Sequence, residues 1–420
     1  MAYKDLIKVG YSKVLGDIHS SKIWNQIHRR LQRQIRRHFQ GQTGRPEWLE
    51  VINKVQAARQ ENATLEIEGQ CILIPAFRFD GVGIQAMLRI CVMLLARQSN
   101  VTYVHLPFMK LAHQNLDPIG HALTPEEWAV KWEAFFNFGK DEFHIADLAN
   151  VMGEANLAKH LSVRRHQFGT PQDDRDMLLN FIEKIRGHDS GVSGIYTFDL
   201  KICRQSRKYR LFLDAEFIQL LQEKFETNGY KPEEILFKEQ YLNIAIHIRR
   251  GDVWGACQAG SKERKYARRL VSEAYYVELI QRLWNFFESS SKPVRFHIFS
   301  DGQPDDFGQF AFIDEREAAL KLESGILIEN IQFHLCQNSI DAMYHMIKAP
   351  IFVPGKSTFS VVAVLLSNSY IFYENEICEF YQYNLLEKYM EKNPRFISLN
   401  ELEERIDNVI EVLSSSRIMT

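Results

Sequence analysis

The sequence has no long apolar run, no clustered cysteines and no excess of charge of one sign. An apolar stretch such as Ile90–Ala96 is far shorter than the roughly 18 residues of a membrane span, and the N-terminal residues lack the apolar segment of a signal peptide. The six cysteines are widely spread and form no C-x-x-C pair, which excludes a disulfide framework and a zinc pattern. We therefore predict a protein of the reducing cytoplasm without a membrane span.

Charge and length limit the protein classes further. The 51 basic and 53 acidic side chains give a net charge of −2, whereas a protein that coats nucleic acid has a basic excess. Apolar residues make up 45% and charged residues 25% of the chain, the composition of an ordinary globular protein. At 420 residues the chain is long for one core, so two domains and no nucleic-acid partner are expected.

Residues 1–60 show a helical pattern, with apolar side chains at every fourth position and arginines around them. The apolar positions are Ile23, Ile27, Leu31, Ile35 and Phe39. Three interpretations fit this pattern: an amphipathic helix packed on its own domain, a membrane-surface helix, or a seam for a homo-oligomer. We favour the first, with the arginines in solvent.

A strand, a glycine-rich loop, a helix and a second strand follow one another after residue 70. The strand Cys71–Pro75 precedes the loop Phe79–Gln85, and the apolar helix Ala86–Arg97 precedes the strand Val101–Leu106. This order is a βαβ unit. The loop glycines could aim backbone N–H groups at an anionic ligand, or they could simply connect strand to helix.

The middle of the chain, residues 110–235, contains no motif that we can assign to a family. Thr124 is followed by a proline and two glutamates, which predicts a helix start. The next apolar side chains could be core or a platform for a sugar ring. They are Trp128, Trp132, Phe135 and Phe136.

No metal site is predicted. Residues Asp173–Asp176 contain Asp-x-Asp, which holds a metal–nucleotide pair in some glycosyltransferases, but an apolar helix follows directly and a helix cap explains them better. The histidines at 160, 166 and 188 lack the spacing of metal ligands.

The second half of the chain alternates strands and helices. Strands are predicted at 242–249, 294–299, 331–334, 351–353 and 370–373, and helices at 272–288, 308–322 and 339–348. This βαβα alternation predicts a parallel, doubly wound sheet. The tail, residues 377–420, is predicted to be helical.

Three polar loops follow predicted strands of this half: His247–Asp252, Ser300–Gly302 and Gly355–Ser360. Because the carboxyl ends of the strands in a doubly wound sheet line one crevice, a single anionic ligand could touch all three loops. The alternatives are a structural ion-pair network, an ordinary Asp-Gly turn and a plain serine helix cap.

The strand before the first loop divides its cations between two faces. The isoleucines at 244, 246 and 248 alternate with Ala245, His247 and Arg249, so His247 and Arg249 share one face, whereas Arg250 starts on the isoleucine face or lies just beyond the strand. Arg249 could grip a phosphate with two N–H donors. Asp252 could hold an arginine in place or act as a base.

The third loop resembles a P-loop without being one. Gly355 is followed by Lys-Ser-Thr, but the glycine that the motif needs five residues earlier is replaced by Pro350. Ser357 and Thr358 at a helix N-terminus still offer hydroxyl and backbone donors to a phosphate.

Together these segments resemble the fucosyltransferase superfamily that comprises α1,2-, core α1,6- and protein O-fucosyltransferases. The segment His247-Ile-Arg-Arg-Gly-Asp252 is similar to the first donor motif, in a form closest to the α1,2 enzymes. Ile298-Phe-Ser-Asp301 resembles the second motif and Ser357-Thr-Phe-Ser360 the third. Gly81-Val-Gly-Ile-Gln85 resembles the family's G-x-G-x-Q loop, with Ile84 where asparagine is usual.

The resemblance implies a GT-B fold, in which two Rossmann-like, doubly wound domains face a cleft. The expected domains are an N-terminal helical extension (1–60), an acceptor-side domain (61–238), a donor domain (239–376) and C-terminal helices (377–420). GDP-fucose would be the donor substrate, a glycan or glycosylated molecule the acceptor, and no cofactor or metal would be needed.

The resemblance also assigns roles to residues. Arg249 would bind the β-phosphate, His247 would support the donor, and Asp301, next to Ser300, would contact the guanosine. The residues that would line the diphosphate are Ser357, Thr358 and Phe359, and those that would close over the donor from the first domain are Asp80, Gly81, Val82, Gly83 and Gln85. Fucose would be transferred with inversion.

Glu263, Asp80 and Asp252 are alternatives for the general base, and a loose transition state would need little base. Two other functions stay open: transfer of another GDP-sugar, and a catalytically silent scaffold that binds a GDP-sugar.

Overall fold

The computed structural model describes residues 68–78, 80–109, 111, 123–157, 167–168, 175–187, 192–204, 206–251, 253–254, 269–288, 290–322, 324–373 and 385–401. The predicted helix over residues 1–60 lies outside these ranges, as does the tail beyond residue 401. No helix in the described ranges has the length and apolar character needed to cross a membrane.

Five parallel strands form the first sheet, in the order β3-β2-β1-β5-β4. They are β1 Cys71–Pro75, β2 Thr102–His105, β3 Phe143–His144, β4 Gln167–Phe168 and β5 Gly194–Phe198. The helices of this half are α4 Val82–Ser99, α5 Pro125–Phe136, α6 Ile145–Met152, α8 Arg175–Arg186, α9 Lys201–Arg204 and α10 Ala215–Glu226. The predicted βαβ unit is confirmed, because α4 joins β1 to β2 and these two strands pair in parallel.

The segment Gly81–Gln85 was expected to be a loop, and this prediction was wrong. It is the N-cap and first turn of α4, which begins at Val82 and not at Ala86. The backbone N–H of Gln85 donates to the Gly81 carbonyl at 3.3 Å, and its side chain donates to the Asp80 carbonyl at 3.0 Å. These bonds fix the start of the helix at Val82, after the short connection from β1.

Eight strands form the second sheet, in the order β13-β12-β11-β6-β7-β10-β9-β8. They are β6 Leu242–Ile248, β7 Val294–Ser300, β8 Ala311–Phe312, β9 Glu317–Lys321, β10 Leu327–Leu335, β11 Ile351–Val353, β12 Tyr370–Tyr373 and β13 Phe396–Ser398. Its helices are α13 Glu273–Phe287, α14 Ser339–Lys348, α15 Thr358–Leu366 and α17 Glu387–Lys392, with short 3₁₀ turns η2 Pro304–Asp306 and η4 Leu399–Glu401. All neighbours pair in parallel except the edge pairs β10–β9 and β9–β8.

The prediction of a helix at 308–322 was wrong, because this segment forms the antiparallel strands β8 and β9. Between them, the Asp314 carboxylate accepts hydrogen bonds from the backbone N–H groups of Arg316 (2.7 Å) and Glu317 (2.6 Å). An aspartate that binds the backbone two and three residues ahead favours a turn over a helix.

The tail is not wholly helical either. After α17, Asn393 and Pro394 end the helix, because the position before a proline disfavours helical geometry. The chain then adds β13 in parallel to β12. Phe396 enters the core on one face of the sheet and Ile397 the core on the other face. The predicted domain boundaries stay predictions.

The alternation predicted for β6 is confirmed. Ile244, Ile246 and Ile248 pack with α13 in one core, whereas Ala245 belongs to the core on the opposite face. All seven residues of the strand are buried.

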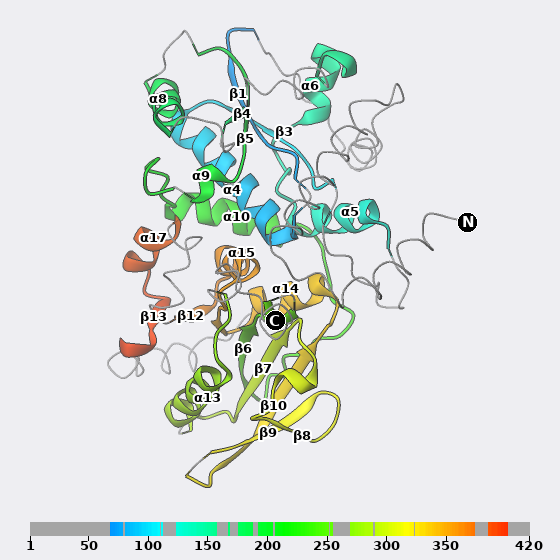
Figure 1. Ribbon diagram of the computed structural model, residues 1–420, viewed down its shortest axis with the longest axis vertical. Coiled ribbons are helices and arrows are strands. Elements are labelled where there is room, and N and C mark those ends of the chain that lie inside the picture. The colour runs from blue at the N-terminus through cyan, green and yellow to red at the C-terminus, as the bar shows by residue number, and fades with distance from the viewer. Residues whose placement is uncertain are drawn as a thin grey trace, which may run out of the picture.

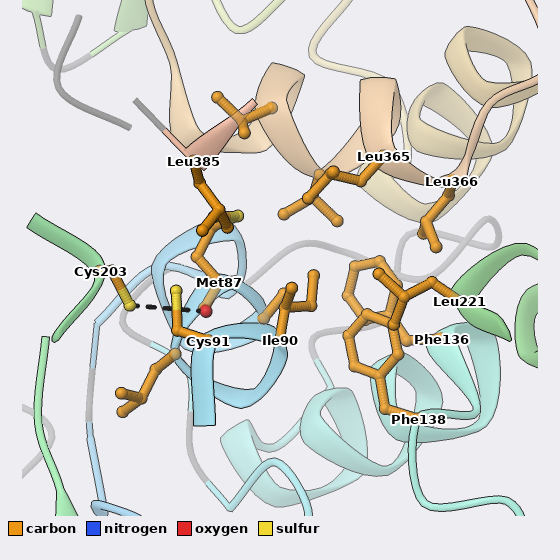
Figure 2. Packing of buried hydrophobic residues seen from close by; sticks show 14 of the residues in the cluster. Met87, Ile90, Cys91, Phe136, Phe138, Cys203, Leu221, Leu365, Leu366 and Leu385 are labelled. Carbon is orange, nitrogen blue, oxygen red and sulfur yellow. Dashed lines mark hydrogen bonds between the residues drawn. The ribbon is translucent and has the colours of Figure 1, made fainter. Parts of the chain in front are cut away.

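Helices from both halves lie between the two sheets (Figure 1). The core there contains apolar residues of α4, α5 and α10 from the first half and of α14 and α15 from the second. Figure 2 shows Ile90 of α4 beside Leu365 of α15 and Phe136 of α5. The predicted start of α5 is confirmed: Thr124 and Glu127 form a reciprocal capping box.

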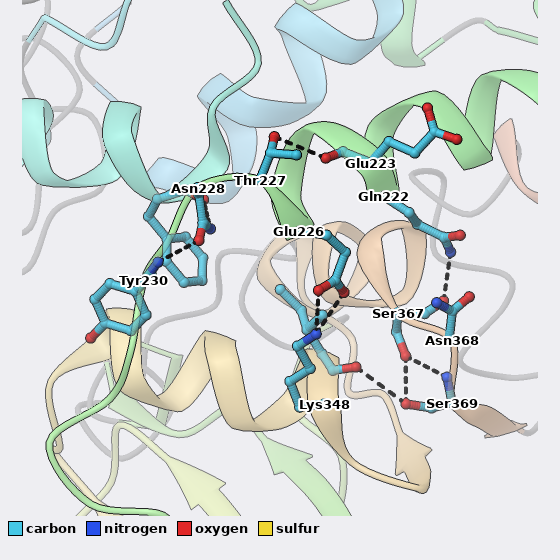
Figure 3. A network of polar contacts seen from close by, with 12 residues as sticks. Gln222, Glu223, Glu226, Thr227, Asn228, Tyr230, Lys348, Ser367, Asn368 and Ser369 are labelled. Carbon is cyan, nitrogen blue, oxygen red and sulfur yellow. Dashed lines mark hydrogen bonds and ion pairs between the residues drawn. The ribbon is translucent and has the colours of Figure 1, made fainter. Parts of the chain in front are cut away.

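Polar contacts join the same helices at the periphery (Figure 3). The Lys348 ammonium of α14 lies 2.6 Å from the Glu226 carboxylate of α10, and the Gln222 amide donates to the Ser367 carbonyl after α15 at 2.8 Å. These contacts join α10 to α14 and to the end of α15.

Candidate anion-binding site

The three predicted loops meet at one edge of the second sheet. Strands β11, β6 and β7 are adjacent and parallel, with Val353 opposite Ile246 and Ile248 opposite Ser300. Each strand therefore delivers its following loop to the same end. The expectation that these loops follow neighbouring strand ends of one sheet is confirmed, and the shared crevice stays a prediction.

Asp301, at the end of β7, holds the turn at the end of β6. One carboxylate oxygen lies 2.5 Å from an Arg249 guanidinium nitrogen, and the other accepts the Arg250 backbone N–H at 2.8 Å. The Arg249 side chain is 25% exposed and that of Asp301 36%, so the ion pair faces solvent.

Two glycines make this close approach possible. Gly251 has φ +27°, and a Cβ there would lie 2.2 Å from an Asp301 carboxylate oxygen. A Cβ on Gly302 would lie 2.8 Å from the Cβ of Arg250. The backbone of each loop therefore lies against a side chain of the other, Gly251 against Asp301 and Gly302 against Arg250. Neither position has room for a larger residue.

Arg250 lies just beyond β6, the second of the two alternatives, and its guanidinium packs over residues of the core on the isoleucine face. It is only 1% exposed, donates to the Val271 carbonyl at 2.9 Å, and lies over the rings of Trp254, Tyr276 and Phe307 at 5.3 to 5.8 Å. Burial lowers the pKa of its guanidinium. Arg250 is therefore a structural cation under the loop. Asp252, its predicted partner, lies outside the described residues, and so does Glu263.

His247 points to the opposite face, toward α15. Its Nδ1 hydrogen-bonds to the Ser360 hydroxyl, and its ring lies 5.8 Å from that of Phe359. Burial, with the nearby charge of Arg249, lowers the pKa of His247 to about 3, so the imidazole is neutral at physiological pH. Ser360 Oγ also accepts the Gly355 N–H at 3.1 Å, which leaves its own proton for Nδ1 and favours the tautomer protonated at Nε2.

The N-termini of two helices from the two halves meet beside this edge. Ser357 is the N-cap of α15, and its hydroxyl accepts the Phe359 N–H at 3.2 Å. Gly81 is the N-cap of α4, and no side-chain hydrogen bond caps this helix. A Cβ on Gly83 would lie 2.7 Å from the Phe359 nitrogen, so the first turns of α4 and α15 touch. Helix N-termini carry partial positive charge and favour anions.

Asp80 forms an ion pair with Arg78. Arg78 forms ion pairs with Asp80 and with Asp199, which follow strands β1 and β5. The triad therefore links two strand ends of the first sheet directly before α4. Val82 and Ile84 are partly buried and pack on the core, so the residue that replaces the family's asparagine makes apolar contacts here.

The aromatic residues of α5 are core and not a sugar platform. Trp128, Trp132, Phe135 and Phe136 are at most 2% exposed. Their spacing of four, three and one residues is typical of one helix face, the sequence signal that favours packing. The Trp132 ring lies 6.0 Å from that of Phe359, so α5 supports the third motif from behind.

Sequence reasoning missed two partnerships. Ser360 belongs to the third motif, but its bond to His247 joins residues 113 positions apart and has no local signal. Asp301 was expected to meet a nucleoside, and its contact with Arg249 depends on the pairing of β6 with β7. Of the Asp-x-Asp motif, residues 173 and 174 lie outside the described ranges, as do the three histidines weighed as metal ligands. Within those ranges, no three His, Cys, Asp or Glu side chains gather as metal ligands would.

Comparisons with known proteins give distant structural likenesses. No protein-family model matches the chain, and no curated protein matches its sequence. The chain is similar to the solved structure of fucosyltransferase NodZ from Bradyrhizobium, with 13% identity, a TM-score of 0.30, and coverage of 71% of this chain and 92% of that one. It is also similar to POFUT1 in complex with GDP, with 12% identity, a TM-score of 0.37, and coverage of 73% and 99%. At these TM-scores the likeness carries no argument about activity, which rests on the geometry of the site.

Proposed function

We propose that the chain is an inverting, metal-independent fucosyltransferase that moves L-fucose from GDP-β-L-fucose to a hydroxyl of a glycan acceptor. One set of contacts supports the proposal. Arg249 of the first motif-like segment pairs with Asp301 of the second, His247 of the first bonds to Ser360 of the third, and Gly83 of the N-terminal segment packs on Phe359 of the third.

The donor diphosphate would occupy the space in front of Arg249 and the two helix N-termini. A guanidinium carries five N–H donors, so it can hold Asp301 and a phosphate oxygen at the same time. The first turns of α4 and α15 add backbone N–H groups and the positive ends of two helix dipoles, with Ser357, Thr358 and Phe359 on one side and Gly81 to Gln85 on the other. The two helices start at the same place, which suits a ligand with two phosphates.

The reaction needs charge stabilisation at the leaving group. The acceptor oxygen attacks the anomeric carbon of fucose, the bond from that carbon to the β-phosphate oxygen breaks, and its electron pair leaves with GDP. Arg249 and the helix N-termini stabilise the developing negative charge where it appears. His247, neutral because burial holds its pKa near 3, can donate a hydrogen bond through Nε2 but does not supply a proton as an acid.

The acceptor proton needs a route to a base or to solvent. Two carboxylates near the edge are already held, Asp301 by Arg249 and Asp80 by Arg78. We therefore propose Glu263 as the base, with Asp252 as the alternative. Asp252 is the last residue of the first motif, and Glu263 lies about ten positions after it.

The test is GDP release from GDP-fucose, GDP-mannose and GDP-glucose, with and without EDTA, in the presence of a glycan panel. We expect release from GDP-fucose alone, unaffected by EDTA, with an α-linked fucosylated product identified by NMR. Turnover of GDP-mannose or GDP-glucose would replace the proposed donor. Binding of GDP-fucose without turnover on any acceptor would favour a silent scaffold, and the absence of binding would refute the proposal.

A further inference from the structure

We infer that Lys356 is a second cation of the donor site, whose ammonium binds the diphosphate and stabilises the charge that develops on it as fucose leaves. The inference rests on the proposed function and adds a residue to it. Lys356 follows Gly355 in the third loop, and the resemblance to the fucosyltransferases assigns it no role.

The third loop is held firmly against the end of β6. A Cβ on Gly355 would lie 2.5 Å from the His247 carbonyl oxygen, so the loop backbone packs directly on that strand end. At the other end of the loop, the Ser360 hydroxyl hydrogen-bonds to the His247 ring and accepts the Gly355 N–H. Lys356 lies between these two anchors and directly before Ser357, the N-cap of α15. Its backbone therefore lies beside the proposed diphosphate site.

No protein group within the described ranges engages the side chain of Lys356. The residue is partly exposed, and its ammonium forms neither a hydrogen bond nor an ion pair with any residue that the structure describes. Lys348 of the same half shows the contrast, since its ammonium lies 2.6 Å from the Glu226 carboxylate. A lysine carries its charge and three N–H donors on a long flexible stem, which suits an anion in front of the loop.

The charge balance at this strand edge points to the same lysine. The Arg249 guanidinium lies 2.5 Å from the Asp301 carboxylate, so this pair carries no net charge, whatever else Asp301 contacts. His247 is neutral because burial holds its pKa near 3. Arg250 is turned into the core and, at 1% exposure, cannot touch a ligand. Among the described residues of the three loops, Lys356 is therefore the accessible cation that is not paired with a carboxylate.

The leaving group of the proposed reaction needs such a cation. GDP leaves with the electron pair of the broken bond, so negative charge on its β-phosphate increases as the bond to the anomeric carbon breaks. A cation that touches this phosphate binds the transition state more tightly than the ground state and so raises kcat. A lysine acts there as a point charge, whereas an arginine adds directed N–H donors. Lys356 thus supplies, from the chain itself, countercharge that a metal-independent transfer requires.

The test compares Lys356→Gln, which removes the charge, with the wild type and with Lys356→Arg, which keeps it. Lys321→Gln is the matched control, because Lys321 is an exposed lysine on β9, near the far edge of the same sheet. Isothermal titration calorimetry measures the Kd of GDP, and GDP release at saturating GDP-fucose measures kcat.

We expect Lys356→Gln to weaken GDP binding about tenfold, the usual size of one charge-assisted hydrogen bond. The same variant should lower kcat on the order of 10²-fold, as the loss of a charge-stabilising donor does. Lys356→Arg should keep most of the affinity and of the rate. Wild-type affinity and kcat in Lys356→Gln, or an equal loss in Lys321→Gln, would overturn the inference.

Two further measurements separate a phosphate contact from damage to the fold. Urea unfolding should give Lys356→Gln the stability of the wild type, because the ammonium has no partner among the described residues. Added salt should weaken GDP binding less in Lys356→Gln than in the wild type, because salt screens the ion pair that the variant lacks. A loss of affinity that comes with lower stability, or with an unchanged salt dependence, would assign Lys356 a structural role and overturn the inference.

Failure of the proposed function gives a different result. A wild type that binds GDP but transfers no fucose would refute the transferase, and the GDP affinity of Lys356→Gln would still decide whether the lysine contacts the diphosphate. A wild type that binds neither GDP nor inorganic pyrophosphate would refute both the proposed function and the role of Lys356.

Discussion

The two arginines of the first motif should fail in different ways when each is replaced by alanine. Arg250 is enclosed between the loop and the core, with one hydrogen bond to Val271 and three aromatic rings around its guanidinium. Loss of the bond leaves the partly buried Val271 carbonyl without this donor, at about 1–3 kcal/mol, and each ring contact adds about 0.5–1 kcal/mol. Removal of a desolvated charge returns part of this, so we expect Arg250→Ala to lower the free energy of unfolding by about 3 kcal/mol.

Arg249→Ala should leave the fold intact and abolish transfer. Its ion pair with Asp301 faces solvent, so its loss should cost no more than about 1 kcal/mol of stability. The loss of a charge-stabilising donor at the leaving group lowers the rate on the order of 10²–10³-fold. Urea unfolding followed by circular dichroism measures stability, and single-turnover GDP release measures chemistry.

Arg316→Ala is the matched control, because Arg316 is an exposed arginine paired with Glu234 at 3.0 Å on the far edge of the sheet. It should change neither stability nor rate appreciably. Equal destabilisation by Arg249→Ala and Arg250→Ala would refute the assignment of the two side chains to opposite faces. Full activity of Arg249→Ala would refute its role at the diphosphate.

Three further predictions concern the helix junction, the buried histidines and α5. Gly83→Ala places a Cβ 2.7 Å from the Phe359 nitrogen, so it should move α4 away from α15. We expect the free energy of unfolding in urea to fall by about 1–3 kcal/mol and GDP binding, measured by calorimetry, to weaken. Wild-type values for both quantities would contradict the close contact. Burial, with nearby positive charge, lowers the pKa of His334 to about 3. As the pH falls from 6.5 toward 3, His334 is therefore protonated in the unfolded chain but not in the folded one. The free energy of unfolding should fall by about 1.4 kcal/mol per pH unit over this range. Unfolding of His334→Gln at pH 6.5 and 5.0 should show a shallower loss than the wild type, and an equal slope would argue against a neutral buried His334. Trp132→Ala should lower stability by about 3–5 kcal/mol as a core truncation, whereas loss of acceptor binding at unchanged stability would indicate a sugar platform instead.

Local signals in the sequence were sufficient wherever neighbouring residues determine the structure. The isoleucine alternation of β6 predicted both faces of the strand. Thr124 and Glu127 predicted the start of α5, and Ser272 that of α13, where its hydroxyl accepts the Tyr275 N–H. Capping residues act within one turn of helix, so the sequence contains the whole interaction.

The failures occurred where distant partners decide. Residues 308–322 contain apolar side chains that suit a helix, but pairing with β10 and the turn at Asp314 make two strands of them. The tail gains β13 because β12 offers an unpaired edge. In the candidate site, the order of strands and helices in the sequence was enough to predict that the three loops lie at one end of the sheet. The contacts of Asp301 with Arg249 and of Ser360 with His247 could not be predicted, because they depend on how strands and helices are aligned with one another.

The central claim is that the four segments build one diphosphate site. A crystal structure of the protein with GDP tests it most directly. The account predicts the diphosphate within hydrogen-bonding distance of the Arg249 guanidinium and of backbone N–H groups at the first turns of both α4 and α15, with Asp301 still bound to Arg249. A diphosphate bound elsewhere, or one that touches neither Arg249 nor the two helix N-termini, would contradict it.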